Sequence, residues 1–493
     1  MASDDSDNQP RQQTRHPVSD VVVKAAGRSV WLRRTLGLSQ KEAVASATMT
    51  ATGDNFFNAF AVYLQASALQ MGWLTAIPQL FGALSQILSA WLGNYLPRKP
   101  MVVITAMLQA LVVSALALLA ILHPQNSVNW LIALAVLYFA CTNFIQPQWR
   151  AWMGSLVPQR RRGAFFAART RLTMIASLIV FAGGGVLLNF SASLSVVWVG
   201  FALLFSIAAI GRTLSARLLH LMHDPDPRPH PERRNGFRQS MSQLYSSLHD
   251  KTFRDYSFFV AGMQGVVAIS APFFAVYMLS DLGFSYLQYS LNAIASIVTQ
   301  FLTLGFWGRF TDKYGNRIVM QFCCFTIPLI PVLWMLSPDF YYLLVVQMVS
   351  GFVWSAFSLS TANYLYDIRP HRSDFAVYAA TQSALGALAV FVGAIGGGLI
   401  AAVAPDVFAR FDIGTGLESW IISPLFLVFA ATTMLRLAVA LWFVPRAREP
   451  RIRRRPGVLQ LIYRISRFNA ITGVSLDWLS VTRKSRPKDQ DAE

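Results

Sequence analysis

The sequence predicts an all-α protein whose chain crosses a membrane many times. Hydrophobic residues make up 54% of its 493 residues and charged residues 13%, about half the charged share of soluble domains. So few charged residues cannot cover the surfaces of several soluble domains. Apolar stretches of about 20 residues, long enough to cross ~30 Å of hydrocarbon, recur from end to end. They lack the strict alternation of apolar and polar residues that marks membrane β-strands.

Twelve apolar stretches are long enough to be membrane-spanning helices. In chain order they cover residues 44–66, 73–94, 101–122, 130–150, 165–189, 195–218, 254–279, 286–307, 318–337, 340–362, 375–402 and 420–444. Residues 1–43 precede the first stretch, residues 220–253 (the central loop) follow the sixth, and residues 445–493 follow the twelfth. We therefore predict two six-helix halves, residues 44–219 and residues 254–444, between polar segments.

Positive charge is distributed unevenly over the predicted loops. Lys and Arg cluster before the first stretch, after each even-numbered stretch and in the tail, as at Arg98, Lys99, Arg160, Arg161, Arg162, Arg233, Arg234, Lys313, Arg317, Arg369, Arg372, Arg453, Arg454 and Arg455. The opposite loops carry Asp281, Asp339, Asp406 and Glu418, with Arg410 as their only Lys or Arg. This distribution follows the positive-inside rule, so both termini and the central loop are expected in the cytoplasm. It does not indicate a nucleic-acid partner, because no soluble module with a basic face is visible.

The tail also indicates a lipid partner. Beyond Pro456, apolar residues recur at helical spacing beside Arg464 and Arg467. They are Val458, Leu461, Ile462, Ile465 and Phe468. The pattern predicts an amphipathic helix on the anionic cytoplasmic leaflet, with a disordered tail as the alternative. An excess of arginine over lysine is typical of GC-rich bacterial coding sequences, so we expect the bacterial cytoplasmic (inner) membrane.

The chain contains an internal repeat. "FAVYL" at residues 60–64 recurs as "FAVYM" at residues 274–278, and "AWLGNYLPRK" at residues 90–99 aligns with "GRFTDKYGNR" at residues 308–317. Further matches in the same order are Gln86 with Gln300, Pro158 with Pro370, Arg160 with Arg372, Gly183–Gly185 with Gly396–Gly398, and Arg212 with Arg436. Several matches in order at nearly constant offset indicate that the second half repeats the first.

"GRFTDKYGNR" resembles the loop signature Gly-x-Leu-x-Asp-Arg-x-Gly-Arg-Arg of the major facilitator superfamily. The matching residues are Gly308, Asp312, Lys313, Gly315 and Arg317; the first-half copy keeps Arg98 and Lys99 but has Ala90, Asn94 and Pro97 instead of Gly, Asp and Gly. The resemblance implies two parallel six-helix halves around a midplane site. It also implies that these residues form a gating loop that closes the cytoplasmic side. We expect a monomer.

Asp54 is the main candidate for a functional residue. It lies about ten residues into the first span, hence ~15 Å deep at 1.5 Å per residue. An ionisable group at that depth costs ~2.5–3.5 kcal/mol on insertion scales and is a functional candidate by default. In the repeat, Asp54 aligns with Ala268, so the fold does not require an acid there. On a continuous helix Thr50, Asp54, Asn58 and Gln65 would share one face.

Other polar residues within the spans are weaker candidates for contacts with a solute or proton. They are Asn55, Asn58, Gln65, Asn143, Gln264, Asn292, Gln300 and Asn363. Hydrogen bonds between helices are an alternative role for most of them. Arg212 and Arg436 lie near the cytoplasmic ends of their spans, so their side chains are expected to extend toward the membrane surface.

The sequence therefore predicts a secondary active transporter that moves a small solute by alternating access, with Asp54 exchanging a proton or another cation. There is no Gly-Lys dipeptide and hence no Walker phosphate loop. His-Glu-x-x-His and Gly-x-Ser-x-Gly are also missing, so we do not expect an enzyme. No cofactor or metal site is expected. A non-transporting sensor or assembly factor on the same fold is the alternative.

Overall fold

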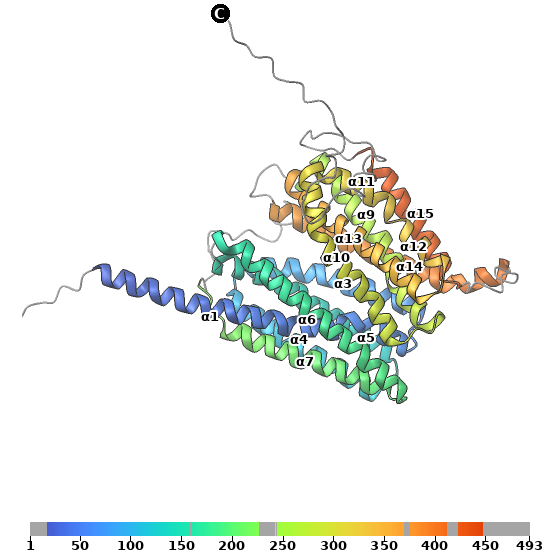
Figure 1. Cartoon of the computed structure of the whole chain (residues 1–493), viewed down its shortest axis with the longest axis horizontal. Coiled ribbons are helices and arrows are strands. Elements are labelled where there is room, and N and C mark those ends of the chain that lie inside the picture. The colour runs from blue at the N-terminus through green and yellow to red at the C-terminus, as the bar shows by residue number, and fades with distance from the viewer. Residues whose placement is uncertain are drawn as a thin grey trace, which may run out of the picture.

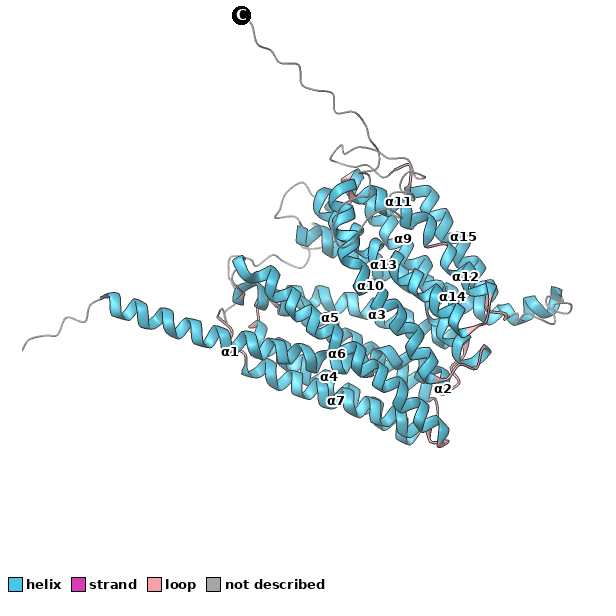
Figure 2. Ribbon diagram, viewed as in Figure 1, coloured by secondary structure: helices cyan, strands magenta, loops and turns pink. Residues whose placement is uncertain are grey.

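The computed structural model describes residues 17–157, 159–225, 242, 244–368, 375–411 and 423–446, and within these ranges its regular structure is helical (Figure 1, Figure 2). The first half consists of α1 (Pro17–Thr52), η1 (Asp54–Phe56), α2 (Phe57–Tyr63), α3 (Ala68–Leu92), α4 (Arg98–Leu122), α5 (Ser127–Leu156), α6 (Gln159–Ser193) and α7 (Val197–Leu221). The second half consists of α9 (Lys251–Val276), η3 (Tyr277–Asp281), α10 (Tyr286–Tyr314), α11 (Asn316–Thr326), α12 (Leu329–Leu336), α13 (Phe340–Ile368), α14 (Phe375–Phe411) and α15 (Phe426–Phe443).

The arrangement confirms an all-α membrane protein with two six-span halves. Among the described residues, ten helical segments are long and apolar enough to cross a membrane. The other two predicted spans correspond to α3 and to the first span, which is built from α1, η1 and α2. The predicted tail helix at 458–468 and the basic clusters at 233–234, 369–372 and 453–455 lie outside the described residues.

The helices run back and forth between two ends of the bundle, named here by a residue at each. The Arg98 end carries the α3–α4 connection and the α10–α11 connection at Gly315. The His123 end carries the α2–α3 and α4–α5 connections. Helix α1 extends beyond the other helices at the Arg98 end (Figure 1). It begins at Pro17, well before the span predicted to start at residue 44.

The two halves touch at the His123 end. Gly72 on α3 lies against α14, where a Cβ on Gly72 would come within 2.7 Å of the Ala394 carbonyl oxygen. Gly185 on α6 lies equally close to Ser290 on α10. Small residues let membrane helices approach each other in this way. In Figure 1 the helices of the two halves accordingly come together on the side opposite to the α1 extension.

The repeat also appears in how helices begin. Ser67 accepts a hydrogen bond from the Gln70 backbone while the Gln70 side chain accepts one from Ser67, which forms a capping box at the start of α3. Ser285 and Gln288 form the same box at the start of α10. Each box satisfies two backbone donors that a helix start would leave unpaired. "SALQ" and "SYLQ" therefore begin equivalent helices in the two halves.

Two predicted elements differ in the structure. The signature residues 308–314 are not a loop, because α10 continues to Tyr314 and only Gly315 separates it from α11. Gly315 has φ +93°, which glycine adopts without the steric cost that a Cβ would add. The ninth span is not one helix either: α11 ends at Thr326, and α12 begins after Pro328, which cannot donate a helical hydrogen bond.

Candidate functional site

The first span is broken at Gly53, and this break positions Asp54. Helix α1 ends at Thr52, and Asp54 opens a short 3-10 turn before α2. A Cβ on Gly53 would lie only 2.6 Å from the Met49 carbonyl oxygen, so a side chain does not fit there. The repeat-equivalent helix α9 runs without a break through Ala268. The expectation of one helix over 44–66 is therefore wrong.

As a result, the four polar residues expected on one helical face lie in different elements. Thr50 belongs to α1, Asp54 to the 3-10 turn and Asn58 to α2. Gln65 follows the end of α2, with φ +59°, and lines a surface pocket near His123 at the membrane edge. The break therefore interrupts the predicted helical face, which a continuous helical periodicity could not anticipate.

Aromatic packing holds the broken segment in place. The Phe56 ring lies 5.0 Å from that of Phe181 on α6. The Phe57 ring meets Tyr138 on α5 edge-on at 5.3 Å, and the Phe60 ring lies 4.8 Å from that of Phe201 on α7. Such pairs each contribute ~0.5–1.5 kcal/mol beyond the burial of their area. The 3-10 turn and α2 are thus held by three neighbouring helices.

Asp54 lies at the junction of the two halves. The Tyr289 hydroxyl on α10, in the second half, donates to the Asn55 carbonyl oxygen at 3.4 Å. The Oδ1 atom of Asp54 is buried and has no hydrogen-bond partner among the described residues. Asn55 in the turn and Asn58 in α2 are both partly exposed. The broken segment therefore presents an acid and two amides where the halves meet.

The facing part of α10 also carries unpaired polar groups. Asn292 lies about one turn from Tyr289 and is fully buried, yet neither polar atom of its amide has a partner within the described structure. The neighbouring Ser290 hydroxyl is likewise buried without one. Leaving such a group unsatisfied costs ~1–3 kcal/mol. Because buried polar groups in native proteins are nearly always paired, each exception calls for an explanation.

A cavity of about 500 Å³ lies between the halves. Its lining comes from α3 and α5 of the first half and α9, α13 and α14 of the second: Thr75, Gln79, Ala83, Gln86, Asn143, Gln264, Val267, Ala268, Ala271, Trp354, Ser383, Gly386, Ala387 and Val390. The predicted residues Asn143 and Gln264 thus face the same space from opposite halves. The Asn143 amide donates to the Phe139 carbonyl at 2.9 Å. We call this space the inter-half cavity.

The remaining sequence candidates lie elsewhere. Gln300 is partly buried on α10 and Asn363 is partly buried on α13, both outside the lining of the inter-half cavity. Within the described part of the chain, no group of three His, Cys, Asp or Glu side chains is arranged to hold a metal ion.

The signature residues lie at the Arg98 end. Gly308, Asp312 and Lys313 are in the last two turns of α10. The Lys313 ammonium lies 5.4 Å from the centre of the Tyr314 ring. Arg317 is in the first turn of α11, and its neighbour Asn316 donates to Asp367 Oδ2 on α13 at 2.9 Å. The signature thus ties the start of α11 to the end of α13.

The first-half copy makes a different connection. Arg98 and Lys99 are in the first turn of α4. The Arg98 guanidinium lies 3.8 Å from the Asp224 carboxylate, just beyond the end of α7. Asn94 replaces the signature acid in this half, so the two copies join different helices at the same end of the bundle.

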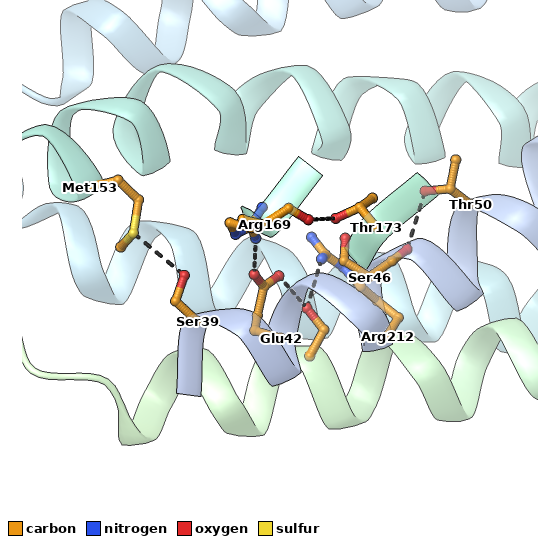
Figure 3. A network of polar contacts seen from close by, with 9 residues as sticks. Ser39, Glu42, Ser46, Thr50, Met153, Arg169, Thr173 and Arg212 are labelled. Atoms are coloured by element: carbon orange, nitrogen blue, oxygen red, sulfur yellow. Dashed lines mark hydrogen bonds and ion pairs between the residues drawn. The ribbon is translucent and has the colours of Figure 1, made fainter. Parts of the chain in front are cut away.

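Sequence reasoning missed a buried charge network inside the first half (Figure 3). Glu42 on α1 forms an ion pair with Arg169 on α6. The Ser215 hydroxyl donates to Glu42 Oε1 at 3.0 Å and accepts from Arg212 Nη1 at 3.1 Å. The predicted N-terminal tail includes residue 42, yet Glu42 is only 3% exposed. The signal that could have found the network was Arg169, which lies inside the fifth predicted span.

The predicted extension of Arg212 and Arg436 to the membrane surface is also wrong. Arg212 is 4% exposed and Arg436 2% exposed. Arg436 donates from Nε to Thr432 Oγ1 at 3.2 Å, from Nη1 to the Ile327 carbonyl at 3.3 Å and from Nη2 to Ser270 Oγ at 2.9 Å. Hydrogen-bond acceptors inside each half hold these arginines, so neither has to reach the headgroups.

Comparison with known proteins agrees with this geometry. A sequence model of the Major Facilitator Superfamily matches residues 43–268 and again residues 256–483. No curated protein sequence matches the chain.

Three solved structures share the fold. A bacterial homolog of the human lysosomal transporter Spinster, inward-facing and occupied, has a TM-score of 0.59 at 15% identity, covering 85% of this chain and 97% of that one. The nucleoside transporter NupG has a TM-score of 0.55 at 12% identity, covering 84% and 98%. A POT family transporter in complex with a thioalcohol-conjugated peptide has a TM-score of 0.56 at 14% identity, covering 84% and 95%.

Proposed function

Because the chain belongs to the major facilitator superfamily, we propose that it is a secondary transporter that moves a small solute across the membrane by alternating access. The inter-half cavity is the proposed solute site, and Asp54 is the proposed coupling group for a proton or another cation. The observation that carries the proposal is the set of unpaired polar groups where the halves meet, on Asp54, Ser290 and Asn292.

The position of the cavity supports an alternating mechanism. On α3 the contact with the other half is at Gly72, whereas the cavity is lined by Gln79 and Gln86, farther toward the Arg98 end. The halves are therefore closed together at the His123 end and separated by a cavity beyond that contact. With the positive-inside orientation, the Arg98 end faces the cytoplasm, and this arrangement corresponds to an inward-facing state. Both termini are then cytoplasmic, in the bacterial inner membrane, with anionic lipid beside the basic loops.

Asp54 suits a coupling role because its surroundings depend on the junction. While the halves are closed, its Oδ1 atom is buried without a partner. Opening the junction would admit water or a cation to the carboxylate, and a carboxyl group that changes its surroundings in this way can take up a proton on one side and release it on the other. The unpaired groups at Ser290 and Asn292 would gain partners in the same step, which offsets their cost in the closed state.

The lining of the cavity suits a solute with both polar and apolar parts. Asn143, Gln264, Gln79 and Gln86 each offer an amide that can donate and accept hydrogen bonds, and Trp354 offers an aromatic surface. Ligand sites of this kind combine an apolar wall with a few convergent polar groups. Asn55 and Asn58 would contact the solute as it passes the junction. Gln65, Gln300 and Asn363 remain proposals for an approach path.

The first experiment identifies a solute and then asks whether Asp54 couples its movement. Candidate solutes are screened by the unfolding temperature of the purified protein in detergent, since binding to the native state raises it. A solute that binds is then tested for uptake into proteoliposomes under an imposed proton gradient. We expect Asp54→Asn to fold normally but to lose accumulation against a gradient, while retaining downhill exchange.

Asp339→Asn is the matched control. Asp339 is exposed at the His123 end and accepts a hydrogen bond from the Tyr342 backbone nitrogen, at 2.8 Å, ahead of α13. Asparagine serves as well as aspartate in this capping role, so accumulation should stay at the wild-type level. Accumulation by Asp54→Asn with the wild-type dependence on pH would remove Asp54 from the mechanism. Binding of a solute without any flux would favour the sensor or assembly role instead.

A further inference from the structure

A second cavity is lined only by residues of the first half. Its volume is about 200 Å³, and its lining comes from α1, α4, α5, α6 and α7: Glu42, Ser46, Met49, Thr50, Gln109, Thr142, Ile145, Gln146, Trp149, Arg169, Arg212 and Leu219. Its lining shares no residue with that of the inter-half cavity. We call it the N-half cavity. It contains the charge network built around Glu42 (Figure 3).

The charged groups that line the N-half cavity do not balance. One carboxylate, that of Glu42, faces two guanidinium groups, those of Arg169 and Arg212. Arg169 forms an ion pair with Glu42, and Arg212 is connected to the same carboxylate only through the Ser215 hydroxyl. The lining therefore carries one positive charge in excess. Burying an uncompensated charge is costly unless a counter-charge joins it.

Both arginines also have hydrogen-bonding capacity to spare. The Nε atoms of Arg169 and Arg212 are buried donors without a hydrogen-bond partner in the described parts of the chain. The repeat provides an internal comparison: in the second half, all three guanidinium nitrogens of Arg436 donate to protein acceptors. Arg436 is thus complete without a ligand, whereas Arg212, its equivalent, is not. Both arginines line the N-half cavity, so the unused donors and the excess charge belong to side chains of the same lining.

We propose that the N-half cavity binds a small carboxylate anion. A single negative charge neutralises the excess positive charge, and a guanidinium matches the two oxygens of a carboxylate with two parallel N–H donors. Thr142 and Gln146 add neutral polar groups, while Met49, Ile145 and the Trp149 ring accommodate an apolar remainder. This site is separate from the proposed solute cavity, so the inference stands whether or not that cavity carries the transported solute.

The test uses the full-length protein in detergent and sodium propionate as the probe. Propionate replaces sodium chloride at constant ionic strength, and unfolding temperature is followed together with tryptophan fluorescence. Trp149 reports on the site because the Arg169 guanidinium lies 4.4 Å from its ring centre. We expect propionate to raise the unfolding temperature saturably relative to chloride. Arg212→Gln should raise the propionate concentration that gives half of the maximal effect by at least roughly tenfold. This is the effect of losing a hydrogen bond to a charged group.

A second pair of variants guards against a folding defect in Arg212→Gln. Gln146→Glu adds a negative charge at an exposed position of the lining and should remove the propionate response. Gln264→Glu makes the same change in the inter-half cavity and should leave the response intact. An unfolding temperature that does not distinguish propionate from chloride overturns the proposal. So does a response that survives Gln146→Glu, or one that Gln264→Glu also removes.

Discussion

At the scale of single residues, the buried charges are held by specific partners. Glu42, at 3% exposure, pairs with Arg169 directly and reaches Arg212 through Ser215. Arg436, at 2% exposure, has no such acid but uses three neutral oxygens. Hydrogen bonds to ionised groups are about twice as strong as neutral ones. The two halves therefore stabilise equivalent arginines in different ways, and only the first half depends on a carboxylate.

We predict that Glu42→Gln destabilises the protein by about 3 kcal/mol, because breaking a buried ion pair leaves an uncompensated charge behind. The measurement is the unfolding temperature in detergent. The double variant Glu42→Gln/Arg169→Gln should be more stable than Glu42→Gln alone, since the stranded guanidinium is removed as well. If the loss of stability in the double variant, relative to wild type, equals the sum of the losses in Glu42→Gln and Arg169→Gln, the two side chains do not interact.

At the scale of elements, two spans are broken, and the breaks have different causes. The first span breaks at Gly53, where Met49 leaves no room for a Cβ, and the break exposes Asp54 and its neighbours to the junction. The ninth span breaks at Pro328, and Arg436 donates to the Ile327 carbonyl near the end of α11. A positive charge is favoured at a helix C-terminus. The first break positions Asp54 and its neighbours, and the second is stabilised by the hydrogen bond from Arg436.

The signature at the end of α10 is proposed to act as a latch at the Arg98 end. Asp312 lies in the last turn of α10, where its own helix dipole disfavours a negative charge. Its charge therefore does not serve the stability of α10. We predict that Asp312→Asn keeps the folded yield near wild type but lowers transport. A contact of ~1 kcal/mol shifts a two-state ratio about fivefold, here toward the inward-open state.

The measurement for the latch is the distance distribution between spin labels at the Arg98 end, for example at Leu96 and His249, which are both exposed. Asp250→Asn at the same end is the control. Asp250 accepts hydrogen bonds from the Thr252 and Phe253 backbone nitrogens at the start of α9, a capping role that asparagine also fills. Unchanged populations in Asp312→Asn would argue against a latch.

At the scale of the whole molecule, the halves meet through a surface of small residues. A Cβ on Gly398 of α14 would lie 3.2 Å from the Ala68 carbonyl oxygen and 3.4 Å from the Gly72 Cα on α3. Gly396, two residues earlier, has nothing within 4 Å of an added Cβ. Interfaces between membrane helices depend on such small residues, because lipid tails compete with any larger apolar side chain for the same surface.

We predict that Gly398→Leu prevents the halves from closing at the His123 end and so abolishes transport. Gly396→Leu is the matched control on the same helix and should transport normally. Flux is measured in proteoliposomes, and closure by spin-label distances across the His123 end. Normal flux in Gly398→Leu would mean that this contact does not form part of the cycle.

The orientation of the molecule gives a further prediction. The native cysteines Cys141, Cys323 and Cys324 are buried, so an introduced cysteine can be labelled selectively. Gln125 at the His123 end and Leu96 at the Arg98 end are both exposed. An impermeant thiol reagent added to whole cells should label Gln125→Cys but not Leu96→Cys, following the positive-inside rule. The reverse pattern would place the termini outside.

The sequence alone determined the number of spans, their order and their division into two repeated halves. The physical reason is that a bilayer imposes a one-dimensional rule: each crossing needs about 20 apolar residues, whatever it packs against. The repeat of "FAVYL" as "FAVYM" and the pairing of Arg212 with Arg436 could likewise be read along the chain. Asp54 could also be proposed as a candidate in this way, because a carboxyl group deep in a span is conspicuous without any knowledge of its neighbours.

Only the tertiary structure decided which polar groups meet. Glu42 and Arg169 are 127 residues apart, and nothing in their local sequence says that α1 packs against α6. The break at Gly53 depends on a contact with the Met49 carbonyl that helical periodicity does not encode. Asn143 and Gln264 line one cavity, whereas Gln65 lines another. The packing of the helices decides which residues share a cavity. Hydropathy measures how favourably each single segment enters lipid. A binding site, by contrast, is formed by the packing of several segments on one another.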